Sequence, residues 1–124
     1  MKVLVCGDRN WTDRKAIRVC LRELTKQGYT TVIHGCARGA DRIAAFEAKQ
    51  MWYTIEHYPA KWGLYHRAAG PIRNQQMLDE GKPVLVIAFH DHIELSSGTA
   101  DMLSRAEKSG IPYALISHPT ISFT

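Results

Sequence analysis

The sequence lacks the features that mark disulfide-rich, membrane-spanning and secreted proteins. Its 124 residues include only three cysteines, Cys6, Cys20 and Cys36, an odd number without a CxxC pair, which is typical of reduced thiols. No apolar run approaches the roughly 20 residues that a membrane-spanning helix needs. The apolar run after Lys2 ends at Gly7 and is too short for a signal peptide. We therefore expect a cytoplasmic protein without a membrane span.

Internal repeats, linkers and low-complexity segments are also missing from the sequence. A chain of this length fits one domain and can bury a core without disulfides or metal ions. We expect that domain to span residues 1–117, followed by a loose C-terminal tail over 118–124.

The charge balance is modestly positive, with 16 Lys and Arg residues against 12 Asp and Glu residues and a net charge of +4. Such a balance can attract phosphates or nucleic acid. The charges are interspersed along the chain, however, which favours an ordinary solvated surface. Charge alone therefore leaves the kind of partner open.

Apolar runs alternate with helix-like segments along the chain. The pattern predicts strands at 2–6, 29–34, 53–59, 83–89 and 112–117. It predicts helices from Thr12 or Asp13 to Gly28, over 40–51, from Pro71 to about Glu80, and from about Gly98 to Gly110. The remaining stretches, 60–70 and 90–97, are expected to be irregular. This alternation predicts an α/β fold with a parallel sheet, and the near-continuous apolar strands indicate helices on both faces.

Four polar loops follow the predicted strands, and ligands of open parallel sheets bind beyond the carboxyl ends of the strands. The loops are GDRNW (7–11), GCARGAD (35–41), PAKWGLYHRAAGPIRN (59–74) and HDHIELSSGTAD (90–101). Glycines near helix N-termini let the backbone approach an anion, and arginine adds bidentate donors for phosphate. Together the loops predict a site for a nucleotide-like anion, although neither the Walker spacing nor GxGxxG is present.

Each loop taken alone also fits an ordinary structural role. GCARGAD suits a strand-to-helix turn in which Gly39 has a positive φ and Asp41 caps the helix. SSGTAD suits a helix cap formed by Ser96, Ser97 or Thr99, and AGPIRN suits a helix that starts at Pro71. Only the combination of loops favours a ligand site.

Several other residues have a plain interpretation that we prefer or weigh equally. His90 and His92 lack a third ligand nearby, so a surface loop is favoured over a metal site, and we expect neither a metal nor a cofactor. Cys36 beside His34 is better read as a small buried thiol than as a nucleophile. Three aromatic side chains lie near the loops and suit either base stacking or cover for the sheet end: Trp11, Trp62 and Tyr65. Four side chains are expected in the core: Cys6, Cys20, Trp52 and Met77.

Four stretches together resemble a known family. VLVCGDR (3–9), IHGCARGAD (33–41), AGPIRNQQML (69–78) and SSGTADM (96–102) are similar to motifs of the YspA-like, cpYpsA-related group of the SLOG superfamily. The resemblance covers about residues 1–117. It implies a single Rossmann-like domain with a five-stranded parallel sheet of order 3-2-1-4-5, and a site for a nucleotide or nucleotide-derived ligand. Among distant relatives, LOG-type proteins cleave the base–ribose bond of nucleoside monophosphates, DprA handles single-stranded DNA, and other members are regarded as ligand sensors.

The resemblance also assigns ligand-binding residues by position. They are Gly7 and Arg9 in the first loop, Gly35, Arg38, Gly39 and Asp41 in the second, Arg73 and Asn74 beside it, and Ser97, Gly98 and Thr99 for phosphate. The LOG motif PGGxGTxxE is not matched, because ELSS precedes Gly98 and Met102 stands at the position of the LOG glutamate. Asp101, one residue earlier, and Asp41 are the candidate catalytic carboxylates if the protein is an enzyme.

Three functions follow as hypotheses. The first is binding, for sensing or processing, of a nucleotide-like small molecule at the carboxyl edge of the sheet. The second is a nucleotide N-glycosidase. The third and weakest is single-stranded DNA binding, suggested by segment 60–67 and by a basic helix stripe of Lys15, Arg18, Arg22 and Lys26. Relatives often associate, so a homo-oligomer is one of the states that the sequence leaves open.

Overall fold

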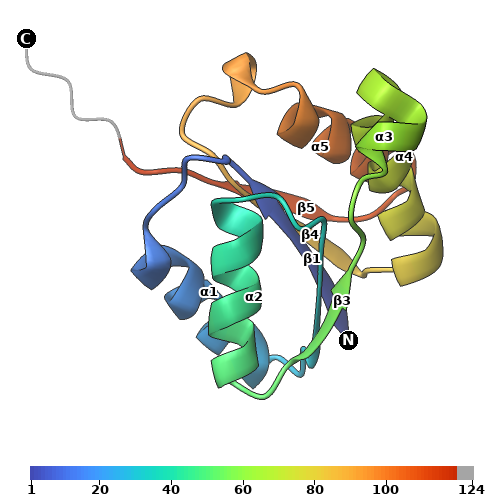
Figure 1. Cartoon of the computed structure of the whole chain (residues 1–124). Helices are drawn as coiled ribbons and strands as arrows, with labels where there is room; N and C mark the ends of the chain where they lie inside the picture. The colour runs from blue at the N-terminus through green and yellow to red at the C-terminus, as the bar shows by residue number, and fades with distance from the viewer. Residues whose placement is uncertain (120–124) are drawn as a thin grey trace, which may run out of the picture.

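The fold is built on one parallel sheet, as the alternation of segments predicts. The computed structural model describes residues 1–119, and within that range the sheet has five strands in the order β3-β2-β1-β4-β5 (Figure 1). The strands are β1 (Lys2–Gly7), β2 (Thr31–His34), β3 (Thr54–His57), β4 (Leu85–Phe89) and β5 (Tyr113–Ile116). Every neighbouring pair is parallel. The α/β class and the order 3-2-1-4-5 are therefore confirmed.

Helices cover both faces of the sheet, because successive residues of a strand point to opposite sides. Val3 and Val5 of β1 pack with α1 (Arg14–Lys26) and α2 (Ala40–Gln50) on one face. Leu4 and Cys6 pack on the other face, beneath α4 (Ala69–Gln76), the π-helical turn η2 (Met77–Gly81) and α5 (Gly98–Lys108) (Figure 1). Among residues 1–119, no helix has both the length and the apolar character needed to cross a bilayer.

Several helix boundaries lie where the sequence places them. The Asp13 carboxylate accepts the backbone N–H of Ala16 at 3.0 Å and caps α1. Gly28 and Gly110 follow the ends of α1 and α5 with φ angles of 93° and 71°, values that favour glycine. The boundaries predicted at Asp13, Gly28 and Gly110 are confirmed.

The prediction that segment 60–70 is irregular is wrong. It contains α3 (Trp62–Tyr65) and the 3-10 turn η1 (His66–Ala68), and α4 already begins at Ala69 rather than at Pro71. Proline is tolerated inside the first turn because the N–H groups there have no acceptor within the helix. The predicted loop 90–97 likewise contains a 3-10 turn, η3 (Ile93–Leu95).

The prediction that Trp52 belongs to the core is wrong. Its side chain is 94% exposed, and its backbone has a positive φ of 66° in the turn after α2. Cys6 and Met77 are buried as predicted, and Cys20 is partly buried against the α1–α2 core.

His118, the first residue of the predicted tail, is tied to the body of the domain. Its ring stacks on Trp11 at a centroid distance of 4.6 Å. Its Nδ1 lies 2.9 Å from Asp91 Oδ2 and its Nε2 lies 2.7 Å from Asp13 Oδ2. Because ionised carboxylates only accept hydrogen bonds, both ring nitrogens donate from an imidazolium. The hydrogen bonds to Asp91 and Asp13 raise the pKa of His118.

We predict that His118→Phe, which keeps an aromatic ring on Trp11, destabilises the protein most at mildly acidic pH. The raised pKa of His118 means that its contribution is complete below its ordinary value of 6.5 and is lost as pH rises through the folded-state value. The hydrogen bonds with His118 lower the pKa values of Asp13 and Asp91, so the contribution is complete above 3.8 and is lost at lower pH. Urea unfolding of both proteins across pH measures this window, and a difference that does not vary with pH would contradict the prediction.

Candidate functional site

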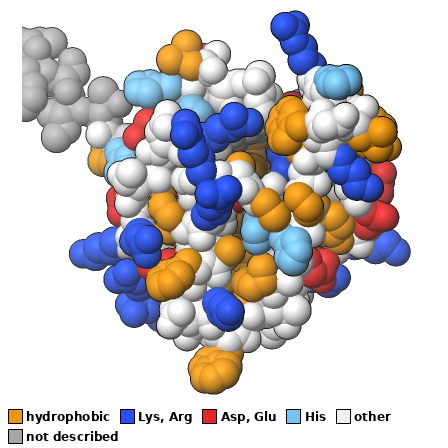
Figure 2. Space-filling model, in the orientation of Figure 1, with side chains coloured by type: hydrophobic (Ala, Val, Ile, Leu, Met, Phe, Trp, Pro, Cys, Tyr) orange, Lys and Arg blue, Asp and Glu red, His pale blue; other side chains and the backbone are white. Residues whose placement is uncertain are grey.

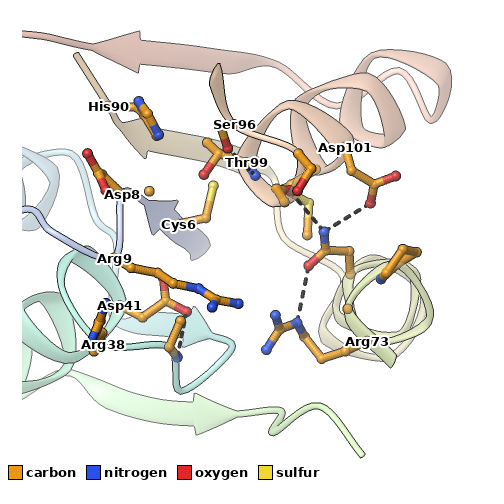
Figure 3. A pocket seen from close by; sticks show the side chains of 18 of the residues that line it. Cys6, Asp8, Arg9, Arg38, Asp41, Arg73, His90, Ser96, Thr99 and Asp101 are labelled. Carbon is orange, nitrogen blue, oxygen red and sulfur yellow. Dashed lines mark hydrogen bonds between the residues drawn. The ribbon is translucent and has the colours of Figure 1, made fainter. Parts of the chain in front are cut away.

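A cleft of about 820 Å³ opens at the carboxyl ends of β1 and β4, between α2, α4 and α5 (Figure 3). Most of the residues assigned from the sequence line it: Gly7, Arg9, Arg38, Asp41, Arg73, Asn74, Ser97, Gly98 and Thr99. They come from all four predicted loops, so the fold brings distant parts of the chain to one place. The volume lies within the range of small-molecule sites.

Gly35 and Gly39 do not line this cleft but allow close packing beneath it. A Cβ atom on Gly35 would lie 2.6 Å from the guanidinium carbon of Arg73. Gly39 has a φ of 76°, and a Cβ atom there would lie 2.5 Å from the carbonyl carbon of Arg9. The positive φ predicted for Gly39 is confirmed. Both glycines shape the wall of the cleft rather than face its interior.

Asp41 holds the loop that precedes α2 instead of capping the helix, which corrects the predicted role. The N-cap position is Gly39, and no side chain caps it. Asp41 Oδ2 accepts the backbone N–H groups of Gly35 at 3.0 Å and Ala37 at 3.3 Å. Burial raises the pKa of Asp41 to about 6, while the two loop hydrogen bonds and the positive charge of Arg73 oppose that rise.

We predict that Asp41→Asn gains stability relative to the wild type as pH rises. The amide oxygen can accept both loop hydrogen bonds, so the variant keeps the loop geometry. Because the folded-state pKa of about 6 exceeds the ordinary value of 3.8, the wild type is most stable below 3.8 and loses this contribution as pH rises through about 6. The free energy of unfolding is measured in urea at about pH 4 and about pH 8.

Asp41→Ala is the matched control, because it removes the charge and also both hydrogen bonds. It is expected to destabilise the protein at each pH. If Asp41→Asn loses as much stability as Asp41→Ala, the two loop hydrogen bonds do not stabilise the fold.

A hydrogen-bonded chain joins the second loop to α5 through α4. Arg73 Nη1 donates to the carbonyl oxygens of Gly35 and Tyr58, and Arg73 Nε donates to Asn74 Oδ1 at 3.2 Å. Asn74 Nδ2 donates to Asp101 Oδ2 at 3.0 Å and to the carbonyl oxygen of Gly98 at 3.2 Å. This chain fixes which side of Asn74 carries its NH₂ group and holds Arg73 at the wall of the cleft. Figure 3 shows Arg73 directed toward the side of the cleft formed by Arg9 and Asp41.

Asp101 is engaged on both sides. Its Oδ2 accepts from Asn74 and also from Arg105 Nε at 2.8 Å, within the same helix. The carboxylate therefore secures the start of α5 against α4 and lies at the edge of the cleft. Both candidate catalytic carboxylates, Asp41 and Asp101, thus have structural partners.

The N-terminus of α5 faces the cleft opposite the arginines. The N-cap residue is Ser97, whose side chain makes no cap hydrogen bond, and Ser96 Oγ accepts the backbone N–H of Thr99 at 3.0 Å instead. The N–H of Gly98 has no acceptor among residues 1–119. Such a free donor at the positive end of a helix is suited to an anion.

Some lining residues were not assigned from the sequence. Asp8 and His90 directly follow β1 and β4, so the rule that sites lie beyond strand ends would have found them. Arg67 belongs to η1 and lies inside the predicted ligand loop 59–74, but nothing in the sequence distinguished it from the other residues of that loop. Trp62 lies at the cleft with 49% of its side chain exposed.

Two of the three aromatic side chains that suit either base stacking or cover for the sheet end lie outside the cleft. Trp11 is buried, and its ring centroid lies 5.6 Å from that of Phe89, so it covers the end of the sheet. Tyr65 is exposed and does not line the cleft.

The histidine and cysteine residues near the loops show no arrangement for metal binding or nucleophilic catalysis. Within the described range 1–119, no three side chains among His, Cys, Asp and Glu lie together as metal ligands. His34 Nδ1 accepts the backbone N–H of Cys36 at 3.0 Å, so this nitrogen is not available to the thiol. Partial burial, followed by the charge of Asp41, raises the pKa of Cys36 and disfavours its thiolate.

Comparison with known proteins gives two matches. The model of the family described as YspA, cpYpsA-related SLOG family matches residues 1–65, which include the first two loops of the cleft. The chain is also similar to the Gene 61 protein of Mycobacterium phage D29, with 36% identity over 118 residues. That similarity covers 90% of this chain and 92% of the phage protein.

Proposed function

The chain belongs to the YspA, cpYpsA-related SLOG family, and from that premise we propose that it binds a nucleotide or nucleotide-derived phosphate ligand in the cleft. Family membership is consistent with a nucleotide-related ligand. The observation that carries the proposal is the facing arrangement of Arg9, Arg38 and Arg73 with the N-terminus of α5 across one cleft. Figure 3 shows these arginines on the side opposite Ser96 and Thr99.

The arginines supply the charge that a phosphate needs. Across residues 1–119, neither Arg9 nor Arg38 has a carboxylate within 4.0 Å, so their guanidinium groups are free to pair with an anion. Arg73 Nη1 and Nε are occupied by the protein, whereas Nη2 has no acceptor in the same part of the chain. A phosphate between them and Gly98 would receive charge-assisted hydrogen bonds from both walls.

Trp62 and Pro71 give the cleft an apolar surface for the nucleoside part of the ligand. The half-exposed indole of Trp62 and the ring of Pro71 line the cleft beside the polar groups. A base or ribose can pack against such a surface while the phosphate is held by the arginines. We infer that the phosphate lies toward α5 and the second loop, and that the nucleoside part extends toward α3.

We favour binding over hydrolysis because both candidate carboxylates are engaged. An N-glycosidase needs a carboxylate beside the sugar carbon that becomes cationic. Asp41 supports the loop 35–37, and Asp101 pairs with Arg105 and Asn74. Release of free base from nucleoside monophosphates would contradict this view if Asp101→Asn abolished it.

The basic stripe offered for DNA binding is partly neutralised. Arg18 pairs with Glu47 through two hydrogen bonds, and Lys26 lies 3.6 Å from Glu23. Its remaining charge suits a solvated helix face. We therefore favour a small-molecule ligand over single-stranded DNA.

We predict that nucleoside monophosphates or ADP-ribose raise the melting temperature, whereas the corresponding nucleosides do not. At a ligand concentration of one hundred times Kd the gain is about 2.7 kcal/mol, which corresponds to roughly 10 °C for a domain of this size. The Arg9→Ala, Arg38→Ala double variant should lose most of the shift because it removes two unpaired phosphate donors. Thermal unfolding with each ligand measures the effect.

Arg22→Ala serves as the matched control, since Arg22 is exposed on α1 and lines no part of the cleft. It should keep the full shift. If every phosphate-bearing compound leaves the melting temperature unchanged, or if nucleosides act equally well, the proposal fails.

A further inference from the structure

A second cavity, of about 640 Å³, adjoins the main cleft on the far side of the first two loops. Arg9, Asn10 and Arg38 line both cavities, so these side chains form the boundary between them. Beyond the boundary, the second cavity is lined by Arg14 at the start of α1 and by Arg42 and Phe46 on α2. Its position follows from the packing of α1 against α2, which sets their first turns beside the loop 7–11.

The second cavity is strongly cationic. Arg9, Arg14, Arg38 and Arg42 line it, and no acidic side chain does. In the part of the chain that the structure describes, none of these four guanidinium groups has a carboxylate within 4.0 Å. Figure 2 shows Lys and Arg side chains gathered over the region above α2. Four like charges around one hollow repel one another, so an anion placed there is favoured.

A neighbouring arginine with a structural role, Arg18, has a carboxylate partner within the protein. Arg18, one turn after Arg14 on α1, donates from Nε and Nη2 to the two carboxylate oxygens of Glu47 at 3.1 and 3.2 Å. Within residues 1–119, the arginines of the second cavity have no carboxylate partner of this kind. Their charge is therefore left available to something other than the protein.

The second cavity also has an aromatic ring, that of Phe46, in its lining. The Phe46 ring is 52% exposed, and the guanidinium carbon of Arg14 lies 5.1 Å from its centroid. Aromatic rings and guanidinium planes are the surfaces on which nucleobases stack. An anion site and a stacking surface thus occur together outside the main cleft.

We propose that the two cavities are two halves of one site, and that its ligand is a dinucleotide-type molecule in which a phosphate chain joins two nucleosides. The phosphate chain crosses the boundary at Arg9 and Arg38, one nucleoside occupies the main cleft, and the other lies against Arg42 and the Arg14–Phe46 pair. This inference rests on the proposed function, because it extends the same site. A ligand of this kind explains why Arg14 and Arg42 line a second cavity beyond the cleft that a single nucleotide would fill.

The test compares compounds with one and with two nucleosides. Titration calorimetry measures the affinity of AMP, GMP, diadenosine tetraphosphate and diguanosine tetraphosphate for the wild type. We expect one of the dinucleoside tetraphosphates to bind at least about tenfold more tightly than the matching monophosphate. The Arg14→Ala, Arg42→Ala double variant should lose about that factor for the dinucleoside compound and bind the monophosphate unchanged.

Arg22→Ala is the control, because it removes an arginine from α1 outside both cavities. Both Arg14 and Arg42 are exposed, and the double variant loses only the contact of Arg14 with Phe46, so its melting temperature without ligand should lie within about 5 °C of the wild type. Phe46→Ser gives a second reading, since it removes the stacking surface and leaves the four arginines in place.

The failures of the two proposals are distinguishable. If a monophosphate binds but the dinucleoside compound binds no more tightly, or if the double variant weakens both equally, the two-part site is overturned and the main cleft stands. If none of the compounds binds, both proposals are overturned. If an oligothymidylate binds more tightly than every dinucleoside compound and loses affinity in the double variant, the second cavity serves a nucleic acid strand instead.

Discussion

Gly39→Ala is expected to lower the free energy of unfolding by about 4 kcal/mol. Gly39 has a φ of 76°, which strains any residue with a Cβ atom. The added atom would also lie 2.5 Å from the carbonyl carbon of Arg9 and close against the backbone of Asp8. Because these neighbours are backbone atoms and the Ala40 N–H donates to the Asp8 carbonyl oxygen at 3.1 Å, the two loops cannot separate without losing that hydrogen bond. Urea unfolding measures the loss.

Gly63→Ala is the matched control for Gly39→Ala. Gly63 lies in α3, and nothing lies within 4 Å of the position that a Cβ atom would take. Alanine there should be neutral or stabilising by up to about 1 kcal/mol, because alanine favours a helix more than glycine does. A loss below about 1 kcal/mol for Gly39→Ala would show that the contact between the first two loops is not fixed.

Gly39 illustrates which features of this fold are predictable from the sequence. The parallel α/β class and the helix ends at Gly28 and Gly110 depend on local patterns, such as apolar runs and glycines after amphipathic segments. The positive φ of Gly39 is of the same kind, since a strand must turn sharply into α2. The strand order was implied only by the family resemblance. The close approach of Gly39 to the loop 7–11 could not be predicted from a local pattern, because that contact joins loops that follow different strands.

Asp41 and Trp52 show why local patterns were insufficient. An aspartate between a strand and a helix is a typical N-cap residue, but Gly39 holds that position and Asp41 is the second residue of α2. Its carboxylate accepts the N–H groups of Gly35 and Ala37 in the preceding loop instead. Trp52 has a large apolar side chain, which is usually buried. It lies in a tight turn with a φ of 66°, however, and its side chain points to solvent. Both outcomes depend on backbone conformations that residue type does not specify.

The candidate site was predictable in its loops but not in its extent. The rule that ligands bind beyond strand ends identified the four loops whose residues line the main cleft. Arg14 and Arg42 lie on the exposed faces of amphipathic helices, where a charged residue is ordinarily interpreted as a solvated surface. Their place beside the cleft follows only from how α1 packs on α2.

Arg73→Met is expected to weaken nucleoside monophosphate binding about 100-fold. Arg73 is the partly buried arginine of the cleft, and Figure 3 shows its side chain extending toward Arg9 and Asp41. Its Nη2 has no acceptor among residues 1–119. Burial lowers the pKa of its guanidinium, which still remains fully charged near neutral pH. In such partly dehydrated surroundings a phosphate pair is stronger than at the surface. Titration calorimetry with AMP and GMP measures the affinity, and urea unfolding measures the stability that the lost bonds to Gly35 and Tyr58 contribute.

Arg105→Met separates the loss of a ligand contact from the loss of a structural arginine. Arg105 also donates to two groups of the protein, Asp101 at 2.8 Å and Gln75 at 3.0 Å, but it does not line the cleft. Its replacement should cost about 1 kcal/mol of stability and change the affinity by less than about threefold. If both variants lose stability but neither loses affinity, Arg73 acts only as a brace between the second loop and α4. A 100-fold loss confined to Arg73→Met would instead identify its free Nη2 as a phosphate donor, because the two arginines differ mainly in which of them faces the cleft.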